Sequence, residues 1–215
     1  ASLSNCYTAT TSCLPPKSVR DGTPLPSIIE ISNSGVCNRK CSFCPRSDPN
    51  YSHVNEFFSN QLHDKLCMDL AKFNFSGIFA YCGFNEPLLK KDIYRDIEFA
   101  RKKMPNSKIE IVTNGDVLDK NRLKKLYDSG LSTILISVYD GKKEEDEFYE
   151  MCESLNLKKD QYVIRNRYKS SEENFFPSLQ KIPSLKVYVN FLPSSLYSYF
   201  LANQGYSLPF KLSAK

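Results

Sequence analysis

Val36-Cys-Asn-Arg-Lys-Cys-Ser-Phe-Cys-Pro-Arg46 is the stretch around which the other features of this chain are arranged. Its three cysteines, Cys37, Cys41 and Cys44, are separated by three and then two residues. One short loop with this spacing can wrap three thiolates around a single metal centre. Iron-sulfur clusters are normally held by four thiolates, and an open ligand position is typical of reactive centres. The loop therefore predicts a metal centre with one position left for another ligand.

The composition indicates one globular domain. The chain has 215 residues, of which 41% are hydrophobic and 25% charged, and these values suit a fold with one core. The net charge of +5 is spread over short basic runs, which are typical of solvated helix faces, so we expect no nucleic-acid partner. No run approaches the roughly 18 apolar residues of a membrane span, and the first residues lack a secretory signal pattern. We therefore expect a cytoplasmic location and no membrane partner.

The cysteine count has more than one interpretation. Eight cysteines could form four disulfides, but such chains are usually smaller, rich in loops and made in oxidising compartments. For the clustered cysteines the alternative is a structural zinc site with His53 or His63 as fourth ligand; otherwise we expect both histidines at the surface. The remaining cysteines are interpreted as buried or incidental thiols: Cys6, Cys13, Cys67, Cys82 and Cys152.

Short apolar strands alternate with amphipathic helices along the chain. The expected strands are 28–31, 76–81, 108–112, 133–138, 161–167 and 185–189; the expected helices are 55–73 with Asn55 as a cap, 93–104, a segment around 123–127, and 142–155. Continuous apolar strands alternating with helices predict parallel βα units. Such units form either an open doubly wound sheet or a barrel, and periodicity does not choose between the two.

Polar clusters follow the expected strands. They are the cysteine loop and the segments 83–87, 113–115, 137–141 and 165–167. In open parallel sheets and in barrels alike, the ligand site lies beyond the carboxyl ends of the strands. We therefore expect these five clusters to converge on one mouth.

The cysteine loop resembles the cluster-binding loop of the radical S-adenosylmethionine (radical SAM) superfamily. The likeness lies in the cysteine spacing, in the aromatic Phe43 before the last cysteine and in the position after the first strand. Over about residues 28–167 it implies an α/β fold, a partial (β/α)6 TIM-like barrel of parallel strands. It also implies a 4Fe-4S cluster held by Cys37, Cys41 and Cys44, with SAM chelating the open iron.

The resemblance implies an enzyme whose cofactors carry the difficult chemistry. Reduction of the cluster would cleave SAM to methionine and a 5′-deoxyadenosyl radical, which abstracts hydrogen from a substrate. An electron donor such as flavodoxin or ferredoxin would be a partner. No catalytic side chain beyond the cluster is assigned.

The segment 83–87 resembles the glycine-rich segment whose backbone binds the SAM amino group in this family. Gly83, Asn85 and Glu86 are the expected contacts. Asn85 stands where a glycine is usual, and glycine permits backbone angles that a side chain resists. Asn nevertheless tolerates left-handed angles better than most residues.

The later strand ends supply the other contacts that the resemblance implies. Ser137 matches a position from which related peptide-modifying enzymes contact SAM. Arg165 or Arg167 would pair with the SAM carboxylate, because a guanidinium suits that bidentate task. Alternation along a strand puts both arginines on one face, so the sequence does not choose between them. Asn114 is a candidate for binding the ribose and Phe43 for packing near the adenine.

The segments 136–141 and 163–168 are most similar to radical SAM proteins that carry a cysteine-rich SPASM domain. No cysteine follows Cys152, so we expect no auxiliary clusters. A truncated gene, a shifted reading frame near residue 175 or a genuine short form would each give such a tail. The expected domains are an N-terminal extension over 1–27, a radical SAM core over 28–191 and a tail over 192–215.

Two other functional interpretations stay open. A degenerate or truncated copy could bind an iron-sulfur cluster without catalysis, and a structural zinc domain is the third possibility. The substrate, a peptide or a small molecule, is not selected by the sequence. Tyr81, Tyr139 and Tyr168 could face a substrate cavity.

Overall fold

The computed structural model describes residues 25–168 and 186–189. Six parallel strands form one sheet in the order β5-β4-β3-β2-β1-β6. These strands are β1 (Ile28–Ile31), β2 (Ile78–Tyr81), β3 (Lys108–Thr113), β4 (Thr133–Val138), β5 (Tyr162–Asn166) and β6 (Lys186–Val189). Residues 1–24 of the expected N-terminal extension and the whole expected tail over 192–215 lie outside the described residues.

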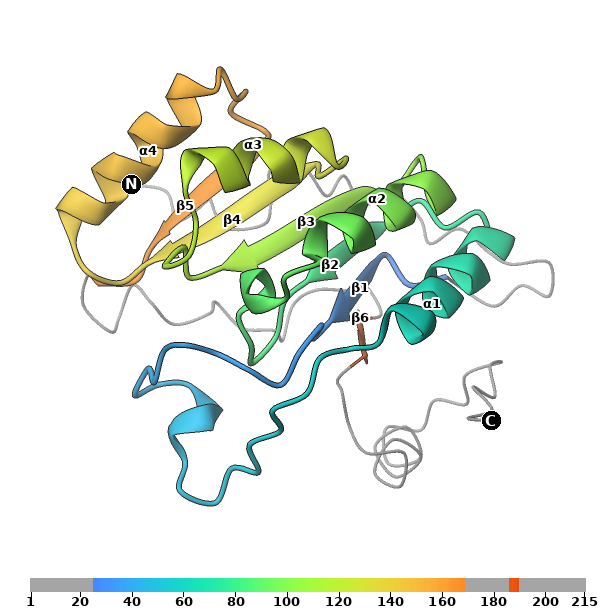
Figure 1. The fold of residues 1–215 in the computed structure, drawn as a ribbon, viewed down its shortest axis with the longest axis horizontal. Coiled ribbons are helices and arrows are strands. Elements are labelled where there is room, and N and C mark those ends of the chain that lie inside the picture. The colour runs from blue at the N-terminus through green and yellow to red at the C-terminus, as the bar shows by residue number, and fades with distance from the viewer. Residues whose placement is uncertain (1–24, 169–185, 190–215) are drawn as a thin grey trace.

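Four α-helices connect successive strands and lie on one face of the sheet (Figure 1). They are α1 (Asn60–Lys72), α2 (Ile93–Lys103), α3 (Lys120–Asp128) and α4 (Lys142–Ser154), accompanied by the 3-10 helices η1 (Pro45–Ser47) and η2 (Pro87–Leu89). A doubly wound sheet would carry helices on both faces. Helices on a single face, with β1 to β5 adjacent in sequence order, identify a partial barrel. No helix within 25–168 is long and apolar enough to cross a membrane.

The last strand pairs with the first one. The backbone of β6 runs parallel to β1, with Ile28 opposite Lys186, whereas simple continuation of the strand order would place it beside β5. Strand β1, which leads into the cysteine loop, therefore has a hydrogen-bonded neighbour on each side.

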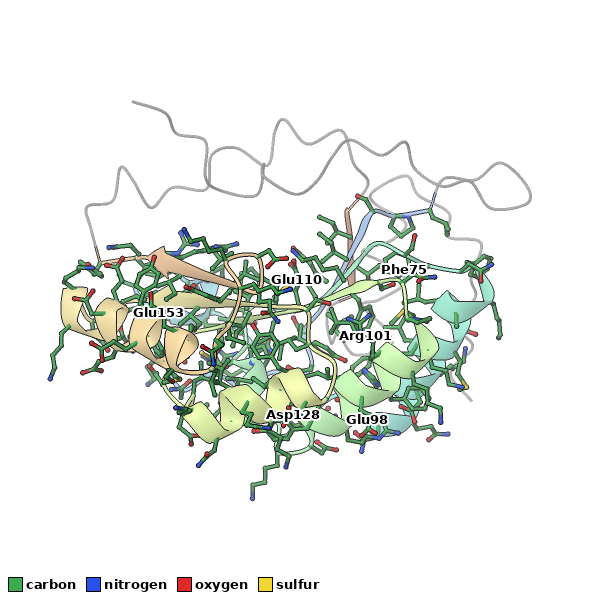
Figure 2. The ribbon with its side chains drawn as sticks, turned by 90° about the horizontal axis from the view of Figure 1, so that it is seen from above. Phe75, Glu98, Arg101, Glu110, Asp128 and Glu153 are labelled. Atoms are coloured by element: carbon green, nitrogen blue, oxygen red, sulfur yellow. The ribbon has the colours of Figure 1, made fainter. Side chains whose placement is uncertain are left out.

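Alternate residues along each strand point to opposite faces of the sheet. Those that pack beneath the helices belong to the buried core, among them Ile31, Phe79, Ile111, Ile134, Ile136 and Val138. The residues between them, including Glu110 and Ser137, point to the other face. Figure 2 shows the sheet and the helix layer edge-on, with Glu98 and Asp128 on the side of the helices away from the sheet and Glu110 beside the sheet.

The predicted start of the first helix was wrong. We expected the helix to begin at Asn55, but α1 begins at Asn60, after the N-cap Ser59. Phe57 instead forms an isolated antiparallel bridge with Ser34. The segment that was expected to be helical therefore pairs with the chain after β1 and closes the base of the cysteine loop.

His63 and Tyr81 also differ from expectation. His63 is fully buried between α1 and the sheet, and its Nε2 lies 2.9 Å from the Tyr81 hydroxyl. Tyr81 therefore faces the helices rather than a substrate cavity. Burial lowers the pKa of His63. The buried imidazole is not a zinc ligand for the cysteine loop, whereas His53 is exposed as expected.

Candidate functional site

The cysteine loop lies beyond the end of β1, and its three cysteines are half-buried free thiols. A turn in which the Cys44 N–H donates to the Cys41 carbonyl at 2.9 Å brings the last two cysteines onto one bend. Helix η1 follows immediately, with Pro at its first position. Burial raises the pKa of the Cys37 and Cys41 thiols, so both are neutral until a metal displaces their protons.

The spacing of the thiols separates two kinds of metal site. Among the described residues, the one group of three potential ligands within 4.8 Å of one another is Asp116, Asp140 and Glu144. The three thiols are therefore spread more widely than that. A tetrahedral zinc site with Zn–S bonds of about 2.3 Å brings its thiolates to about 3.8 Å from one another. Wider spacing suits a cluster, in which each thiolate binds a different iron.

Arg39 fastens the cysteine loop to two neighbouring strand ends. Its Nε lies 2.9 and 2.8 Å from the two carboxylate oxygens of Asp116, after β3. Its Nη1 and Nη2 lie 3.1 and 2.7 Å from the oxygens of Asp140, after β4. Hydrogen bonds from this guanidinium lower the pKa of Asp140. These contacts hold the loop over the mouth of the partial barrel.

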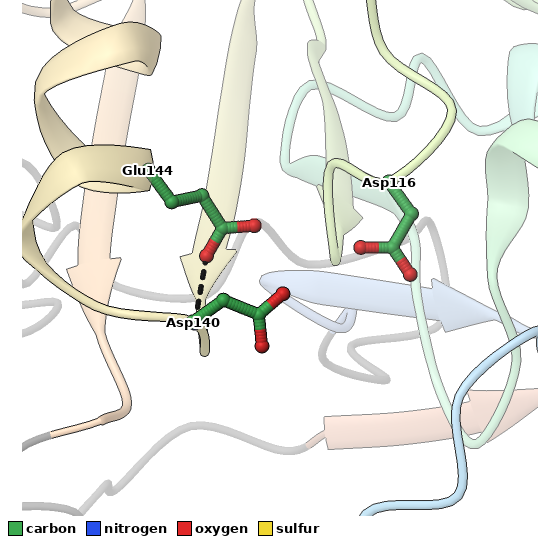
Figure 3. A group of neighbouring side chains, drawn as sticks. All are labelled: Asp116, Asp140 and Glu144. Carbon is green, nitrogen blue, oxygen red and sulfur yellow. Dashed lines mark hydrogen bonds between the residues drawn. The ribbon is translucent and has the colours of Figure 1, made fainter.

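Asp116, Asp140 and Glu144, which we call the acidic trio, converge from the loop after β3, the loop after β4 and the first turn of α4 (Figure 3). Glu144 completes the group, at 3.6 Å from the Arg39 guanidinium. The same Glu144 carboxylate accepts hydrogen bonds from the backbone N–H groups of Tyr139 and Asp140, at 3.0 and 2.9 Å. Arg39 is thus the cation of this group, which explains how three carboxylates can lie so close together.

Asn114 joins the end of β3 to the first cysteine. Its Nδ2 donates to Asn38 Oδ1 at 2.8 Å and lies 4.0 Å from Cys37 Sγ. Its Oδ1 accepts from the Asp116 N–H at 3.0 Å. The structure therefore places this expected ribose contact beside the cysteine loop.

In the segment after β2, the position that requires glycine is Gly83. Gly83 has φ +128°, and a Cβ there would lie 2.1 Å from Ser32 Oγ. Asn85 does not take a left-handed conformation, because the described non-glycine residues with positive φ are Asn74 and Asn156. The unusual residue in this segment is thus unstrained.

The Asn85 side chain is buried and partly satisfied. Its Nδ2 donates to Asn33 Oδ1 at 2.7 Å, while its Oδ1 has no hydrogen-bond partner among the described residues. A buried acceptor without a donor is uncommon in native structures and indicates a missing ligand or water.

Glu86 is buried and holds the ends of β2 and β3 together. Its Oε1 accepts from Thr113 Oγ1 at 2.6 Å and from the Leu88 N–H at 3.0 Å, and its Oε2 accepts from the Asn114 N–H at 2.8 Å. Burial raises the pKa of Glu86. The backbone N–H of Glu86 donates to the Val36 carbonyl at 2.8 Å, which ties this segment directly to the cysteine loop.

The ends of β4 and β5 bring Ser137 and Arg165 together. The two residues are paired in the register of the parallel strands, and both lie on the face away from the helices. Arg167 has the same parity, and its N–H donates to the Val138 carbonyl at 2.8 Å. Arg165 thus lies within β5, whereas Arg167 lies just past its last residue, Asn166.

An aromatic pair lies between the cysteine loop and β4. The Phe43 ring, 68% exposed, stacks on Tyr139 with centroids 6.0 Å apart and planes at 19°. The Arg39 guanidinium lies 4.8 Å from the centroid of the Tyr139 ring. Burial raises the pKa of Tyr139, so this phenol is neutral at physiological pH.

Sequence reasoning missed the residues that fasten the loop, namely Arg39, Asp116, Asp140 and Glu144. A signal was present, since each aspartate adjoins a glycine at a strand end, in Gly115-Asp116 and Asp140-Gly141. The pairing itself joins residues 77 and 101 positions apart, which local patterns do not reveal.

The fold and the site together define a partial-barrel α/β protein with a three-thiol metal loop at the carboxyl ends of its strands. The family model of the radical SAM superfamily matches residues 31–175. This chain therefore belongs to the radical SAM superfamily, whose cofactors are a 4Fe-4S cluster and SAM.

Three curated relatives were found by sequence. The chain is 29% identical over 119 residues to the S-adenosyl-L-methionine-dependent 2-deoxy-scyllo-inosamine dehydrogenase of Niallia circulans, a match that covers 55% of this chain and 47% of that protein. It is 32% identical over 115 residues to the Fe-coproporphyrin III synthase of Methanosarcina barkeri, covering 54% and 28%. It is 29% identical over 122 residues to the GTP 3′,8-cyclase of Aquifex aeolicus, covering 56% and 37%. Each match spans less than half of the relative.

Solved structures show the same architecture. The crystal structure of BtrN in complex with AdoMet and 2-DOIA superposes with a TM-score of 0.59 at 25% identity, over 68% of this chain and 59% of that one. An open conformation of BtrN gives a TM-score of 0.52 at 24% identity, over 66% and 57%. The partial-barrel assignment is thus confirmed.

Proposed function

We propose that this chain is the catalytic core of a radical SAM enzyme, with its core domain over 28–191 and with Cys37, Cys41 and Cys44 holding the 4Fe-4S cluster. The observation that carries the proposal is the cysteine loop itself, with three free thiols and direct bonds to the ends of three later strands. The chemistry that the bound cofactors supply is one-electron reductive cleavage of SAM to methionine and a 5′-deoxyadenosyl radical, which takes a hydrogen atom from the substrate.

The described residues fit these cofactors. Three thiols that are not gathered within 4.8 Å of one another suit a cluster in which each binds a different iron and one iron stays free of protein. The buried Asn85 Oδ1 lacks a donor, and the SAM amino group keeps N–H donors when its nitrogen binds iron. We assign the amino group to the segment 83–87, through Asn85 and the backbone beside Gly83 and Glu86.

Side chains at the next strand ends supply the remaining proposed contacts. Ser137 and Arg165 are adjacent on one face, and Arg165 or Arg167 pairs with the SAM carboxylate. Asn114 is proposed for the ribose. Phe43, which stacks on Tyr139, is proposed to pack near the adenine.

A small-molecule substrate is supported better than a peptide. The names of the three sequence relatives refer to 2-deoxy-scyllo-inosamine, Fe-coproporphyrin III and GTP. We propose a small molecule as the substrate of this chain and a flavodoxin or ferredoxin as the electron donor.

The proposal is tested by anaerobic reconstitution with iron and sulfide, followed by dithionite and SAM. We expect 5′-deoxyadenosine to form and to be lost in Cys41→Ala. The matched control is Cys152→Ala, which removes a thiol in α4, away from the loop; it should retain cluster and activity. A reducible cluster without SAM cleavage supports a non-catalytic iron-sulfur protein instead. Colourless protein that contains zinc contradicts both interpretations.

SAM binding tests the assignment of Asn85 separately. Replacing Asn85 by Ala removes the unpartnered acceptor, so we expect the Kd for SAM to rise about tenfold, as for a buried donor that loses its hydrogen-bond partner. Isothermal titration of the reconstituted protein measures this change. Asn50→Ala is the control, because Asn50 lies on the exposed stretch after η1. An unchanged Kd in Asn85→Ala contradicts the assignment.

A further inference from the structure

The cysteine loop carries two arginines in contrasting surroundings. Arg39 is bonded to the acidic trio, so carboxylates offset its charge. Arg46, two residues after Cys44, takes part in none of the ion pairs found within 4.0 Å among the described residues, and its guanidinium donates to the backbone carbonyls of Gly35 and Phe84. Arginine is always charged, and here the hydrogen-bond acceptors are neutral carbonyls, so no carboxylate offsets the charge of this guanidinium.

Arg46 connects the two segments that surround the proposed cofactor site. Its Nη1 donates to the Gly35 carbonyl at 2.6 Å and to the Phe84 carbonyl at 3.3 Å. Gly35 precedes the first cysteine by two residues, and Phe84 lies in the segment 83–87. The guanidinium also lies 5.5 Å from the centroid of the Tyr51 ring.

The backbone around this connection is tightly packed. A Cβ at Gly35 would lie 2.0 Å from the Val54 carbonyl oxygen, so the acceptor of the shorter bond has little freedom to move. Pro45 at the start of η1 restricts the chain on the other side. Arg46 therefore holds both ends of the cysteine loop in fixed relation to the segment after β2.

We propose that Arg46 is a positioning residue that closes the cysteine loop against the segment 83–87 and raises the reduction potential of the 4Fe-4S cluster by its uncompensated charge. The inference rests on the proposed function, since it requires the cluster at these cysteines. Reduction adds one electron to the cluster, and a nearby cation stabilises the more negative state. Net charge and hydrogen bonding are established determinants of cluster potentials.

The test is an anaerobic redox titration of the reconstituted chain with dithionite, followed by electron paramagnetic resonance. Arg46→Gln keeps hydrogen-bonding capacity but removes the charge, so the equilibrium constant for reduction should fall about tenfold, about 59 mV for one electron. Arg46→Lys keeps the charge and should stay within about threefold of wild type. Lys40→Gln is the matched control, because Lys40 carries its charge on the exposed side of the same loop, where water screens it.

The outcomes are distinct. An unchanged potential in Arg46→Gln, or an equal shift in Lys40→Gln, overturns the proposal. If Arg46→Gln is folded by circular dichroism but takes up no iron, Arg46→Lys decides the question. Iron uptake by Arg46→Lys supports the proposal, and absence of iron uptake in Arg46→Lys overturns the role of the charge. Wild-type protein that forms no cluster overturns the proposed function as well, whereas a wild-type cluster with unchanged variant potentials overturns only the role of Arg46.

Discussion

Arg39 is one side chain that joins three segments of the chain. Without it, the acidic trio would have no cation between its carboxylates, and like charges at this distance repel. The side chains of Arg39 and Asp116 are mostly buried while that of Asp140 is 66% exposed, so the contact with Asp116 contributes more than the contact with Asp140.

Arg39→Ala should therefore destabilise the protein by about 1 to 2 kcal/mol, because it removes the bidentate pair and leaves the trio without its cation. Urea unfolding of the iron-free protein measures this. Lys40→Ala, at the exposed neighbouring position, should change stability by less than about 0.5 kcal/mol. Equal losses in the two variants would show that the contacts of Arg39 are not what holds the loop.

The Arg39 contacts should also weaken in acid. Arg39 lowers the pKa of Asp140 below its ordinary value, so the stabilisation is present above about pH 3.9, the ordinary value for Asp. It is lost as the pH falls through the lowered value. The stability difference between wild type and Arg39→Ala, followed by urea unfolding from pH 7 to pH 3, should narrow at the acid end. A difference that grows on acidification contradicts the ion-pair interpretation.

Glu86 gives a second prediction for a single residue. Its two oxygens accept three hydrogen bonds inside the protein. In Glu86→Gln an NH2 group replaces one of these oxygens, so it would face a group that also donates. A buried group without a partner costs about 1 to 3 kcal/mol, so thermal unfolding should occur at a lower temperature. Glu98→Gln, on the outer surface of α2 (Figure 2), is the matched control and should be neutral.

The elements of the fold were largely predictable from periodicity. Continuous apolar runs located all six strands, and caps and spacing located all four helices to within a few residues, except for the start of α1. There, pairing of Phe57 with Ser34 overrides the helical pattern. The position of β6 beside β1 was not predictable, since a strand's own residues do not specify its neighbour.

The candidate site was predictable only in part. The three cysteines and the segment after β2 were identified by spacing and resemblance. The Arg39 contacts and the buried bonds of Glu86 were not, because they depend on which strand ends meet in space. His63 was misplaced for the same reason: its partner Tyr81 lies on another element.

Helix α2 has its own role at the end of the sheet opposite the site. The Arg101 guanidinium donates to the carbonyls of Pro105, Ser107 and Gly130 and to Ser132 Oγ, at 2.7 to 3.0 Å. It thus joins α2 to the segments that lead into β3 and β4.

Arg101→Ala should cost about 2 to 4 kcal/mol, because it breaks these bonds together, yet leave cluster content per folded molecule unchanged. Urea unfolding and iron analysis measure the two effects. Lys102→Ala, at the exposed next position, should change neither the stability nor the cluster content. Reduced iron in folded Arg101→Ala would show that the two ends of the sheet are coupled.

At the scale of the whole molecule, cofactor loading should stabilise the fold. The thiols and their supporting contacts form in the native state, so a cluster that binds only this state shifts unfolding to higher temperature. Removing iron with a chelator should lower Tm by several degrees in wild type. Cys41→Ala, measured with and without iron by calorimetry, should show no difference. A Tm of wild type that does not respond to iron contradicts the assignment of the loop.

The attachment of the cysteine loop has a consequence for biosynthesis. The partners of Arg39 lie far along the chain, since Asp116 follows it by 77 residues and Asp140 by 101 residues. At about 5 to 20 residues per second, the ribosome completes these partners about 5 to 20 s after the loop emerges. Contacts of such long range also form late in folding. The nascent chain therefore presents three thiols on an unfastened loop for many seconds, and the cluster is best inserted after the first four strands have assembled.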